Sequence, residues 1–316
     1  MTNWTTVREF ILLGLTDNFP LEVSLFLLLF GIYLLTLIGN AVIIIITQVN
    51  VQLCSPIYFF LRHLAWVDIG YMSTVIPKAL VSIATGSKSI SLAGCFIQIF
   101  LYLVLGSTEF FLLAAMSVDR YIAICNPLHY PTIMNNRVCS LLVLCCLAGG
   151  ISIILVVCIP LFLMPFCGPN VMNHFFCDNG PLMKCVDTSF LEMIDFVVAV
   201  FFLLGTLSVN IGSYVKIVST ILHIPSTRGR KKTFSTCVSH LTVVTIAYSG
   251  CIFTYIRLKG TSGLDYNKTV ALLNTVMAPL LIPIIYCLRN RQVQDALKAE
   301  LRQRVGLAKK IEALFY

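Results

Sequence analysis

The chain has 316 residues, of which 58% are hydrophobic and only 11% are charged. A soluble domain carries about 25% charged residues, so this composition excludes a water-soluble globule and indicates an integral membrane protein. The apolar residues come in long blocks, which favours helical spans over the short alternating strands of a membrane barrel. The net charge of +8 is explained by basic loops that meet anionic membrane lipid, so no nucleic-acid partner is expected.

Residues 1–20 form a mixed, polar N-terminal segment. The segment lacks the basic start, short apolar core and small-residue cleavage site of a signal peptide, so we expect the first span to act as the insertion signal. It contains the sequon Asn3-Trp4-Thr5, which predicts glycosylation of Asn3 if this end lies outside the cell.

Seven segments reach the length of about 20 apolar residues that a helix needs to cross a bilayer. They are residues 21–48, 57–83, 92–124, 138–163, 193–222, 233–258 and 269–288. The predicted fold is therefore an all-α membrane protein, a seven-transmembrane helix bundle over residues 21–290. Prolines and glycines inside the spans, such as Pro77, Pro160 and Gly205, predict kinks rather than breaks.

Basic residues predict the orientation of the bundle. One set of connections holds Arg137, the cluster from Arg228 to Lys232 and most of the basic residues after Leu288, whereas the other set holds few. The richer set is predicted to be cytoplasmic, which places the N-terminus outside the cell. In the cytoplasmic tail, residues 291–316, apolar and basic residues alternate from Val293 to Leu301, and this pattern predicts a short amphipathic helix at the interface.

An acidic and a basic residue, Asp119 and Arg120, stand side by side at the end of the third span. Ionisable residues at membrane depth are rare, so this pair is a candidate functional site by default. The alternative interpretation is a solvated helix end, in which the long arginine side chain reaches the interface.

Four of the 13 cysteines fall on the predicted outer side: Cys95, Cys167, Cys177 and Cys185. An even number in an oxidising compartment indicates two disulfides, and four cysteines allow three pairings. A zinc site is the competing interpretation, although the spacing matches no compact ligand pair.

Several motifs in the spans resemble those of a known family. Asp119-Arg120-Tyr121 after the third span and Pro283-Ile284-Ile285-Tyr286 in the seventh resemble the rhodopsin-like G-protein-coupled receptors. The chain is more specifically similar to vertebrate olfactory receptors. The segments that carry this similarity are Pro56 to Leu61, Met116 to Tyr130, Ser213-Tyr214, Lys232 to Cys237, and Ser239-His240-Leu241.

The resemblance implies roles for these residues in activation. Asp119 and Arg120 would form a resting ion pair that opens so that Arg120 can meet a G protein. Tyr214 and Tyr286 would turn inward to support Arg120, which offers several directional donors. Tyr121 and Pro283 belong to the same two motifs. The resemblance also implies the disulfides Cys95–Cys177 and Cys167–Cys185.

Two further acidic residues, Asp68 and Glu109, lie deeper in the second and third spans. Glu109 is about three helical turns, or roughly 16 Å, deeper than Arg120 on the same face of the third span. The resemblance implies a sodium ion shared by Asp68 and Glu109. The alternative is a pair of protonated acids hydrogen-bonded across the core. Ile282 departs from the family pattern, which has asparagine before this proline, and that departure weakens the expected polar network.

A small-molecule site is expected between the helices, in the outer half of the bundle. Three-and-four spacing places its candidates on shared faces of the third and sixth spans, and the resemblance carries the set as a whole. The candidates are Tyr102, Leu103, Gly106, Ser107, Phe202, Tyr248, Cys251, Ile252, Tyr255 and Thr275. No charged residue lies clearly at this depth, apart from Asp195 near the outer end of the fifth span, so a neutral, volatile ligand is expected.

The leading functional hypothesis is an odorant receptor in the plasma membrane that activates a stimulatory G protein and raises cyclic AMP. An ion or solute transporter that uses Asp68 and Glu109 as a relay is the alternative, although the odd number of spans shows no repeated halves. The acids lack a nucleophile or metal ligands beside them, so enzymatic activity is not expected, and neither is a cofactor other than sodium.

Overall fold

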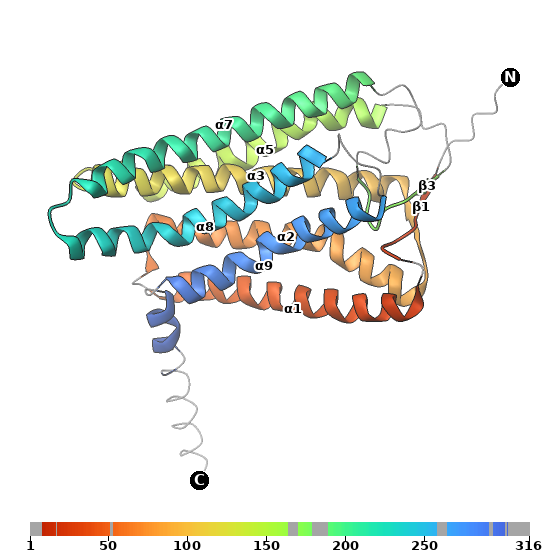
Figure 1. Ribbon diagram of the computed structural model, residues 1–316, viewed down its shortest axis with the longest axis horizontal. Helices are drawn as coiled ribbons and strands as arrows, with labels where there is room; N and C mark the ends of the chain where they lie inside the picture. The colour runs from red at the N-terminus through yellow and green to blue at the C-terminus, as the bar shows by residue number, and fades with distance from the viewer. Residues whose placement is uncertain are drawn as a thin grey trace, which may run out of the picture.

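The computed structural model describes residues 8–16, 18–50, 53–163, 170–178, 189–257, 264–290, 293–300 and 302. This part of the chain forms a bundle of long helices with a small sheet at one end (Figure 1). The long helices are α1 (Phe19–Val49), α2 (Pro56–Thr85), α3 (Leu92–Cys125), α5 (Asn136–Leu163), α7 (Ser189–Leu222), α8 (Thr227–Arg257) and α9 (Leu264–Arg289). A short helix, α4 (Tyr130–Ile133), connects α3 to α5, and residues 293–300 are helical after α9.

The seven long helices coincide with the seven predicted spans. Six of them are long and apolar enough to cross a membrane, and α8 contains a shorter apolar stretch, Cys237–Ile252. The helix α8 begins at Thr227 rather than near residue 233, because its basic first turns continue the helix beyond the apolar part. Lysine and arginine are good helix formers, so hydropathy alone places this boundary too late. The fold is a seven-transmembrane helix bundle.

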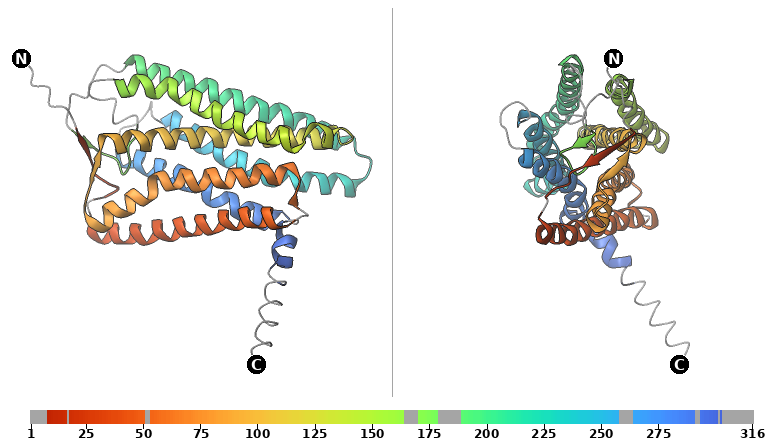
Figure 2. Two further views of the ribbon diagram at one scale, coloured as in Figure 1. Left: turned by 180° about the vertical axis from the view of Figure 1, so that it is seen from behind. Right: turned by 90° about the vertical axis from the view of Figure 1, so that its right-hand side faces the viewer.

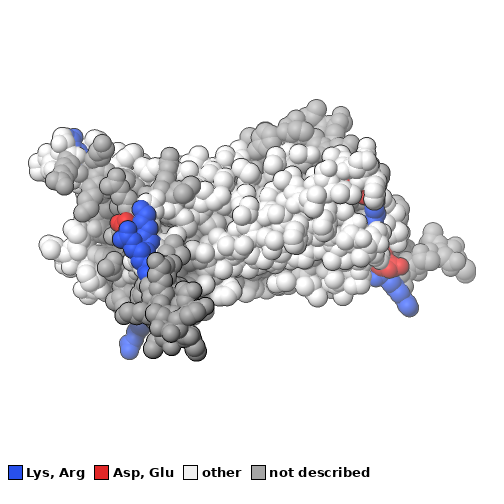
Figure 3. All heavy atoms as spheres, turned by 90° about the horizontal axis from the view of Figure 1, so that it is seen from below, with Lys and Arg blue, Asp and Glu red and all other residues white. Residues whose placement is uncertain are grey.

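On one face of the bundle, the exposed charged side chains lie near its two ends (Figure 3). On the face drawn in Figure 3, the described lysine, arginine and acidic side chains cluster at the ends, and the long middle is free of them. Many large apolar side chains on the outer faces of the helices are exposed, among them Phe201, Leu27 and Leu35. A soluble protein does not expose such a continuous apolar surface, so this belt is the part that lipid covers.

Local sequence explains several helix ends. Ser91 caps α3, because its hydroxyl accepts a hydrogen bond from the Gly94 amide at 3.1 Å. Gly86 ends α2 with φ of 69°, a left-handed conformation that glycine adopts at little cost. In contrast, Pro77, Pro160 and Pro283 lie inside α2, α5 and α9 and do not end them, as the sequence predicted.

A three-stranded sheet that the sequence did not predict lies across one end of the bundle, as the end-on view in Figure 2 shows. Strand β1 (Glu9–Leu12) pairs antiparallel with β2 (Ser89–Ser91) and parallel with β3 (Val171–Met172). The sheet fastens the N-terminal segment to the loops before α3 and after α5. We call this end of the bundle the sheet end, and the opposite end, which carries residues 293–300, the tail end.

The helix α3 is the centre of the bundle, since it packs against α2, α5, α7 and α8. The largest buried apolar cluster joins side chains of α1, α2, α3, α5, α8 and α9. Val293 and Ala296 of the tail helix belong to this cluster, and both are almost fully buried. The predicted apolar face of the tail therefore packs on the bundle.

Candidate functional site

Asp119 and Arg120 form a buried ion pair at the tail end of α3. The Nη2 atom of Arg120 lies 3.0 Å from Oδ2 of Asp119, and Nε donates to the same oxygen at 3.3 Å. The Asp119 side chain has no exposed surface, and that of Arg120 is 16% exposed. This burial contradicts the alternative of a solvated helix end. An unpaired charge here would be costly, so each group holds the other in place.

The second oxygen of Asp119 is bound by a residue of the following connection. The Tyr130 hydroxyl of α4 donates to Oδ1 of Asp119 at 2.8 Å. Burial and the nearby Asp119 carboxylate both raise the pKa of Tyr130, so the hydroxyl stays protonated and remains a donor. The sequence placed Tyr130 within a recognised motif but gave it no role.

Tyr214, expected to support Arg120, contacts a histidine in this structure. Its hydroxyl lies 2.7 Å from Nδ1 of His240, and Nε2 of His240 lies 3.1 Å from the Leu113 carbonyl oxygen. A carbonyl only accepts, so Nε2 carries the proton and Nδ1 accepts from Tyr214. The network joins α7, α8 and α3. Tyr214, His240 and Leu113 are all buried.

The other motif residues lie around the same end of the bundle. Tyr286 is buried, and its hydroxyl has no hydrogen-bond partner among the described residues. Pro283 packs against α1 so closely that a Cβ added to Gly39 would lie 3.0 Å from the proline Cβ. Tyr121 is 36% exposed. A buried tyrosine hydroxyl without a partner is available for a different contact in another conformation.

Asp68 and Glu109 lie close enough to interact electrostatically in the middle of the bundle. Both are buried. Both oxygens of Asp68 and Oε1 of Glu109 lack a hydrogen-bond partner among the described residues. The alternative interpretation was a direct hydrogen bond between Asp68 and Glu109, and no such bond is present in this structure. Within the described residues, no group of three or more His, Cys, Asp or Glu side chains could hold a metal ion.

The predicted ligand residues separate into two groups. In the first, near the sheet end, the Tyr102 hydroxyl lies 3.3 Å from the Thr275 hydroxyl. The Tyr102 ring stacks on Tyr71 with centroids 4.7 Å apart and meets the Phe176 ring, which follows β3, at 5.1 Å. Gly106 faces the Tyr71 ring, since an added Cβ would lie 3.2 Å from it. This group joins α2, α3 and α9 beneath the loop.

The second group surrounds Phe202 on α7. Phe110 of α3 meets Phe202 edge-on at 6.0 Å and Tyr248 of α8 at 4.9 Å between centroids. Asn210 donates to the Tyr248 hydroxyl at 3.3 Å. Sequence spacing did not single out Phe110, Tyr71 or Asn210, because each is one of many similar residues in apolar helices.

The remaining predicted ligand residues were not placed in either of these two groups. Ser107 bonds the Leu103 and Val104 carbonyls of its own helix and lies beside Gly150 of α5. Ile252 is 43% exposed on the outer face of α8. Cys251 is partly buried, and the Tyr255 side chain lies outside the described residues.

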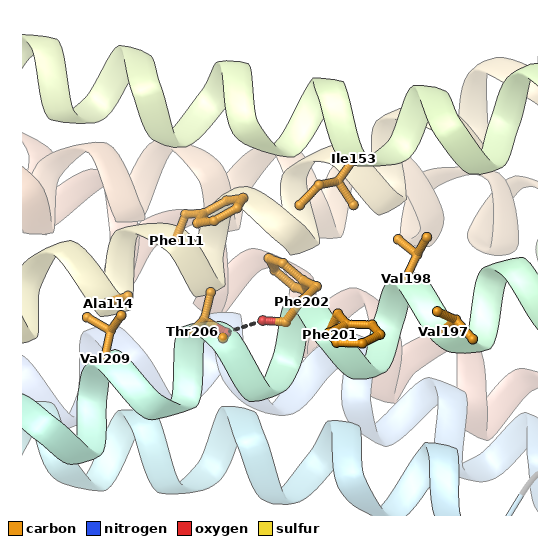
Figure 4. Close-up of a pocket in the computed structure, with 10 residues that line it drawn as sticks. Phe111, Ala114, Ile153, Val197, Val198, Phe201, Phe202, Thr206 and Val209 are labelled. Atoms are coloured by element: carbon orange, nitrogen blue, oxygen red, sulfur yellow. Dashed lines mark hydrogen bonds between the residues drawn. The ribbon is translucent and has the colours of Figure 1, made fainter.

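A cavity of about 500 Å³ lies between α3, α5 and α7 (Figure 4). Its walls include Phe111 and Ala114 of α3, Ile153 of α5, and Val198 and Phe202 of α7. Of the predicted ligand residues whose side chains the structure describes, Phe202 alone lines it. The cavity therefore lies beside the predicted ligand region, on the side that faces out of the bundle between α5 and α7.

One predicted disulfide is present. Cys95 at the start of α3 is bonded to Cys177 in the loop after α5, with Cα atoms 5.5 Å apart. The disulfide holds that loop, including Phe176, over the sheet end. Cys167 and Cys185 lie outside the described residues, as does the sequon at Asn3.

Comparison with known proteins decides the family. A family profile described as olfactory receptor matches residues 29–304. Mouse (Mus musculus) olfactory receptor 6E1 is 55% identical over 301 residues, which cover 94% of this chain and 96% of that protein. The chain belongs to the olfactory receptor family. Human (Homo sapiens) olfactory receptor 6C2 is 49% identical over 98% of this receptor and 100% of its own length.

A comparison of structures shows which known fold this olfactory receptor shares. The crystal structure of squid rhodopsin matches it with a TM-score of 0.70 and 14% identity, covering 90% of this chain and 81% of that chain. At this identity the match establishes the fold alone. The family and the rhodopsin-like fold are those of a receptor and not of an enzyme. They make it a multi-pass membrane protein and give no support to the transporter hypothesis.

Proposed function

We propose that this receptor binds a small, neutral and mostly apolar odorant in the outer half of the bundle and then activates a stimulatory G protein, which raises cyclic AMP. The observation that carries the proposal is the buried pair of Arg120 and Asp119 at the tail end, in a chain of the olfactory receptor family. Arg120 is held ready by one carboxylate and can be released to a G protein if that pair opens.

Two clusters of aromatic side chains support the choice of ligand. Tyr102, Phe176 and Tyr71 form one ring cluster, and Phe110, Phe202 and Tyr248 form another. Rings of this kind bind apolar ligands through their large contact area, and the tyrosine hydroxyls supply a few polar contacts. An odorant activates only if it binds the active arrangement more tightly than the resting one.

The experiment that tests the proposal measures cyclic AMP in cells that express the receptor with an olfactory-type G protein. A panel of volatile odorants identifies a ligand for the parent, and Arg120→Ala is then compared with Arg62→Ala. Arg62 lies on α2 with its guanidinium 5.2 Å from the Phe59 ring centroid, outside the ion pair. Arg120→Ala is expected to reach the cell surface and lose the response, whereas Arg62→Ala keeps it. Normal signalling by Arg120→Ala would refute the role of Arg120.

We also propose that Asp68 and Glu109 bind a sodium ion in the resting receptor. Their three partnerless buried oxygens are hard anionic ligands that suit a small cation, and buried carboxylates without partners are costly. Ile282 is apolar and contributes no ligand. Sodium is expected to raise the melting temperature of the purified parent relative to potassium, but not that of Asp68→Asn. An equal response of both proteins would exclude the site.

The orientation of the receptor is part of the proposal. We place the N-terminus outside the cell, with Asn3 glycosylated and the tail end facing the cytoplasm. The disulfide Cys95–Cys177 at the sheet end supports this orientation, because such bonds persist in oxidising compartments. Endoglycosidase treatment should shift the mass of the parent more than that of Asn3→Gln.

A further inference from the structure

We propose that the cavity between α3, α5 and α7 is a binding site for the acyl chain of a membrane lipid. The cavity has a volume of about 500 Å³. That volume lies within the range of about 300–1,000 Å³ that is typical of small-molecule sites. The proposal concerns this lateral cavity and does not depend on which odorant or G protein the receptor uses.

The chemistry of the cavity wall selects a hydrocarbon. Among the described residues, none that lines it is charged, and its surface is formed almost entirely by apolar side chains such as Phe111, Ile153 and Val198. The one hydroxyl, that of Thr206, donates within its own helix to the Phe202 and Leu203 carbonyls at 2.9 and 3.2 Å. The described part of the wall therefore offers no unused donor. A polar group of a ligand that was buried here would be left unpaired.

The position of the cavity indicates that this hydrocarbon is the acyl chain of a lipid. Its residues fall in the middle parts of the spanning helices: residues 197–209 of α7, Phe111 and Ala114 of α3, and Ile153 of α5. Lipid headgroups and water lie beyond the ends of such helices, whereas acyl chains fill the middle of the bilayer. The side chains of Val197, Phe201 and Val209 around the opening are 42%, 75% and 42% exposed, so they face that lipid.

A glycine in α7 keeps the cavity open. Gly205 lines the cavity, and a Cβ added there would meet no heavy atom within 4 Å. Any larger side chain at this position would occupy space that is now empty. Gly212 of the same helix also has nothing within 4 Å of an added Cβ, but it does not line the cavity. The two glycines therefore form a matched pair for an experiment.

The cavity borders the second ring cluster proposed to bind odorant, and Phe202 belongs to both. Phe202 and Phe111 meet edge-on with centroids 5.1 Å apart, and Phe202 in turn meets Phe110 at 6.0 Å. Phe110 packs on Tyr248 behind it. A chain in the cavity would contact Phe202, so the lipid site and the odorant region are neighbours that share this residue.

Photolabelling of the full-length receptor tests the proposal. The parent, Gly205→Phe and Gly212→Phe are placed in nanodiscs of phosphatidylcholine, a small fraction of which carries a diazirine in the middle of one acyl chain. After irradiation, labelled positions are mapped by mass spectrometry. We expect label on Phe111 and Ala114 of α3 in the parent and in Gly212→Phe, and loss of that label in Gly205→Phe. Label on the exposed Leu27 and Leu28 of α1 should be equal in all three and shows correct insertion.

Two results would overturn the proposal: absence of label on α3 in the parent, or equal label on α3 in the parent and Gly205→Phe. If Gly205→Phe fails to insert, Val198→Phe fills the same cavity from another position on α7 and is judged by the same two results. A thermal measurement is independent of the label. In detergent, added phosphatidylcholine should raise the melting temperature of the parent and Gly212→Phe more than that of Gly205→Phe, because bound ligand stabilises only a site that can accept it.

Discussion

The Tyr214 hydroxyl on α7 lies 2.7 Å from Nδ1 of His240 on α8, while Arg120 is bound by Asp119. Tyr214 is the residue that the family resemblance assigns to Arg120 in the active state. In this conformation its hydroxyl is engaged by a different helix. The hydroxyl donates to His240, whereas Arg120 could only donate to the hydroxyl oxygen. The bond to His240 therefore holds the Tyr214 hydroxyl on α8, and we expect it to influence how easily α8 moves away from α3.

Replacing His240 should weaken the resting arrangement. In His240→Phe, the buried Tyr214 hydroxyl loses its acceptor, which costs about 1–3 kcal/mol in a buried site. We expect a lower melting temperature and a higher cyclic AMP level without ligand. The control is Thr245→Val on the same helix, where the lost hydroxyl bonds only the Leu241 carbonyl. Basal signalling equal to that of the control would show that His240 does not restrain α8.

Tyr130→Phe should also raise basal signalling. The substitution removes the 2.8 Å hydrogen bond to Asp119 and leaves the ring in place, so Asp119 holds Arg120 less firmly. The matched control is Tyr33→Phe, which removes a 2.9 Å hydrogen bond to Ser73 between α1 and α2. We expect a rise in cyclic AMP without ligand for Tyr130→Phe alone. A lower ligand response with unchanged basal level would instead indicate that Tyr130 supports the active state.

The receptor should lose thermal stability in acid because of His174. This side chain is 5% exposed between the rings of Phe175 and Phe176. Its pKa is lowered mainly by burial, and Lys268 lowers it further while Asp178 opposes the shift. The unfolded chain, with a histidine pKa of about 6.5, then binds more protons than the folded one, so stability falls as the pH drops below that value.

Thermal unfolding at pH 7.5 and pH 5 measures this effect. The melting temperature of the parent is expected to be lower at pH 5 than at pH 7.5, and the melting temperature of His174→Gln should fall by less. His223→Gln, which replaces an exposed histidine near the end of α7, serves as the control and should behave as the parent does. If His174→Gln and the parent show the same loss, another group accounts for the acid sensitivity.

Ile282→Asn tests the departure from the family pattern. Ile282 is 1% exposed in the main apolar cluster, so a new amide must find a partner or cost about 1–3 kcal/mol. We expect the amide to donate to the unpaired oxygens of Asp68 and to increase the ligand-driven cyclic AMP response, with little loss of stability. Ile282→Val keeps an apolar residue and should respond as the parent does. A destabilised Asn variant without a larger response would show that the amide does not reach Asp68.

The sequence alone determined the class of fold and the elements of the bundle. Blocks of apolar residues long enough to cross a bilayer dictate spanning helices, because the membrane allows no unpaired backbone, and each predicted span is a helix. The apolar positions of the tail, Val293 and Ala296, likewise gave a short helix that packs on the bundle. The pairing of Cys95 with Cys177 came from resemblance and is present.

Only the tertiary structure decided which side chains meet across helices. The partners Tyr130 with Asp119 and His240 with Tyr214 and the Leu113 carbonyl depend on how α3, α4, α7 and α8 are rotated and offset. Apolar helices show little periodicity, since lipid and core are both apolar, so sequence does not fix these rotations. For the same reason, the sequence did not predict the sheet that β1 forms with two distant loops or the cavity beside Gly205. Both arise from contacts between segments far apart in the chain, where local sequence carries no signal.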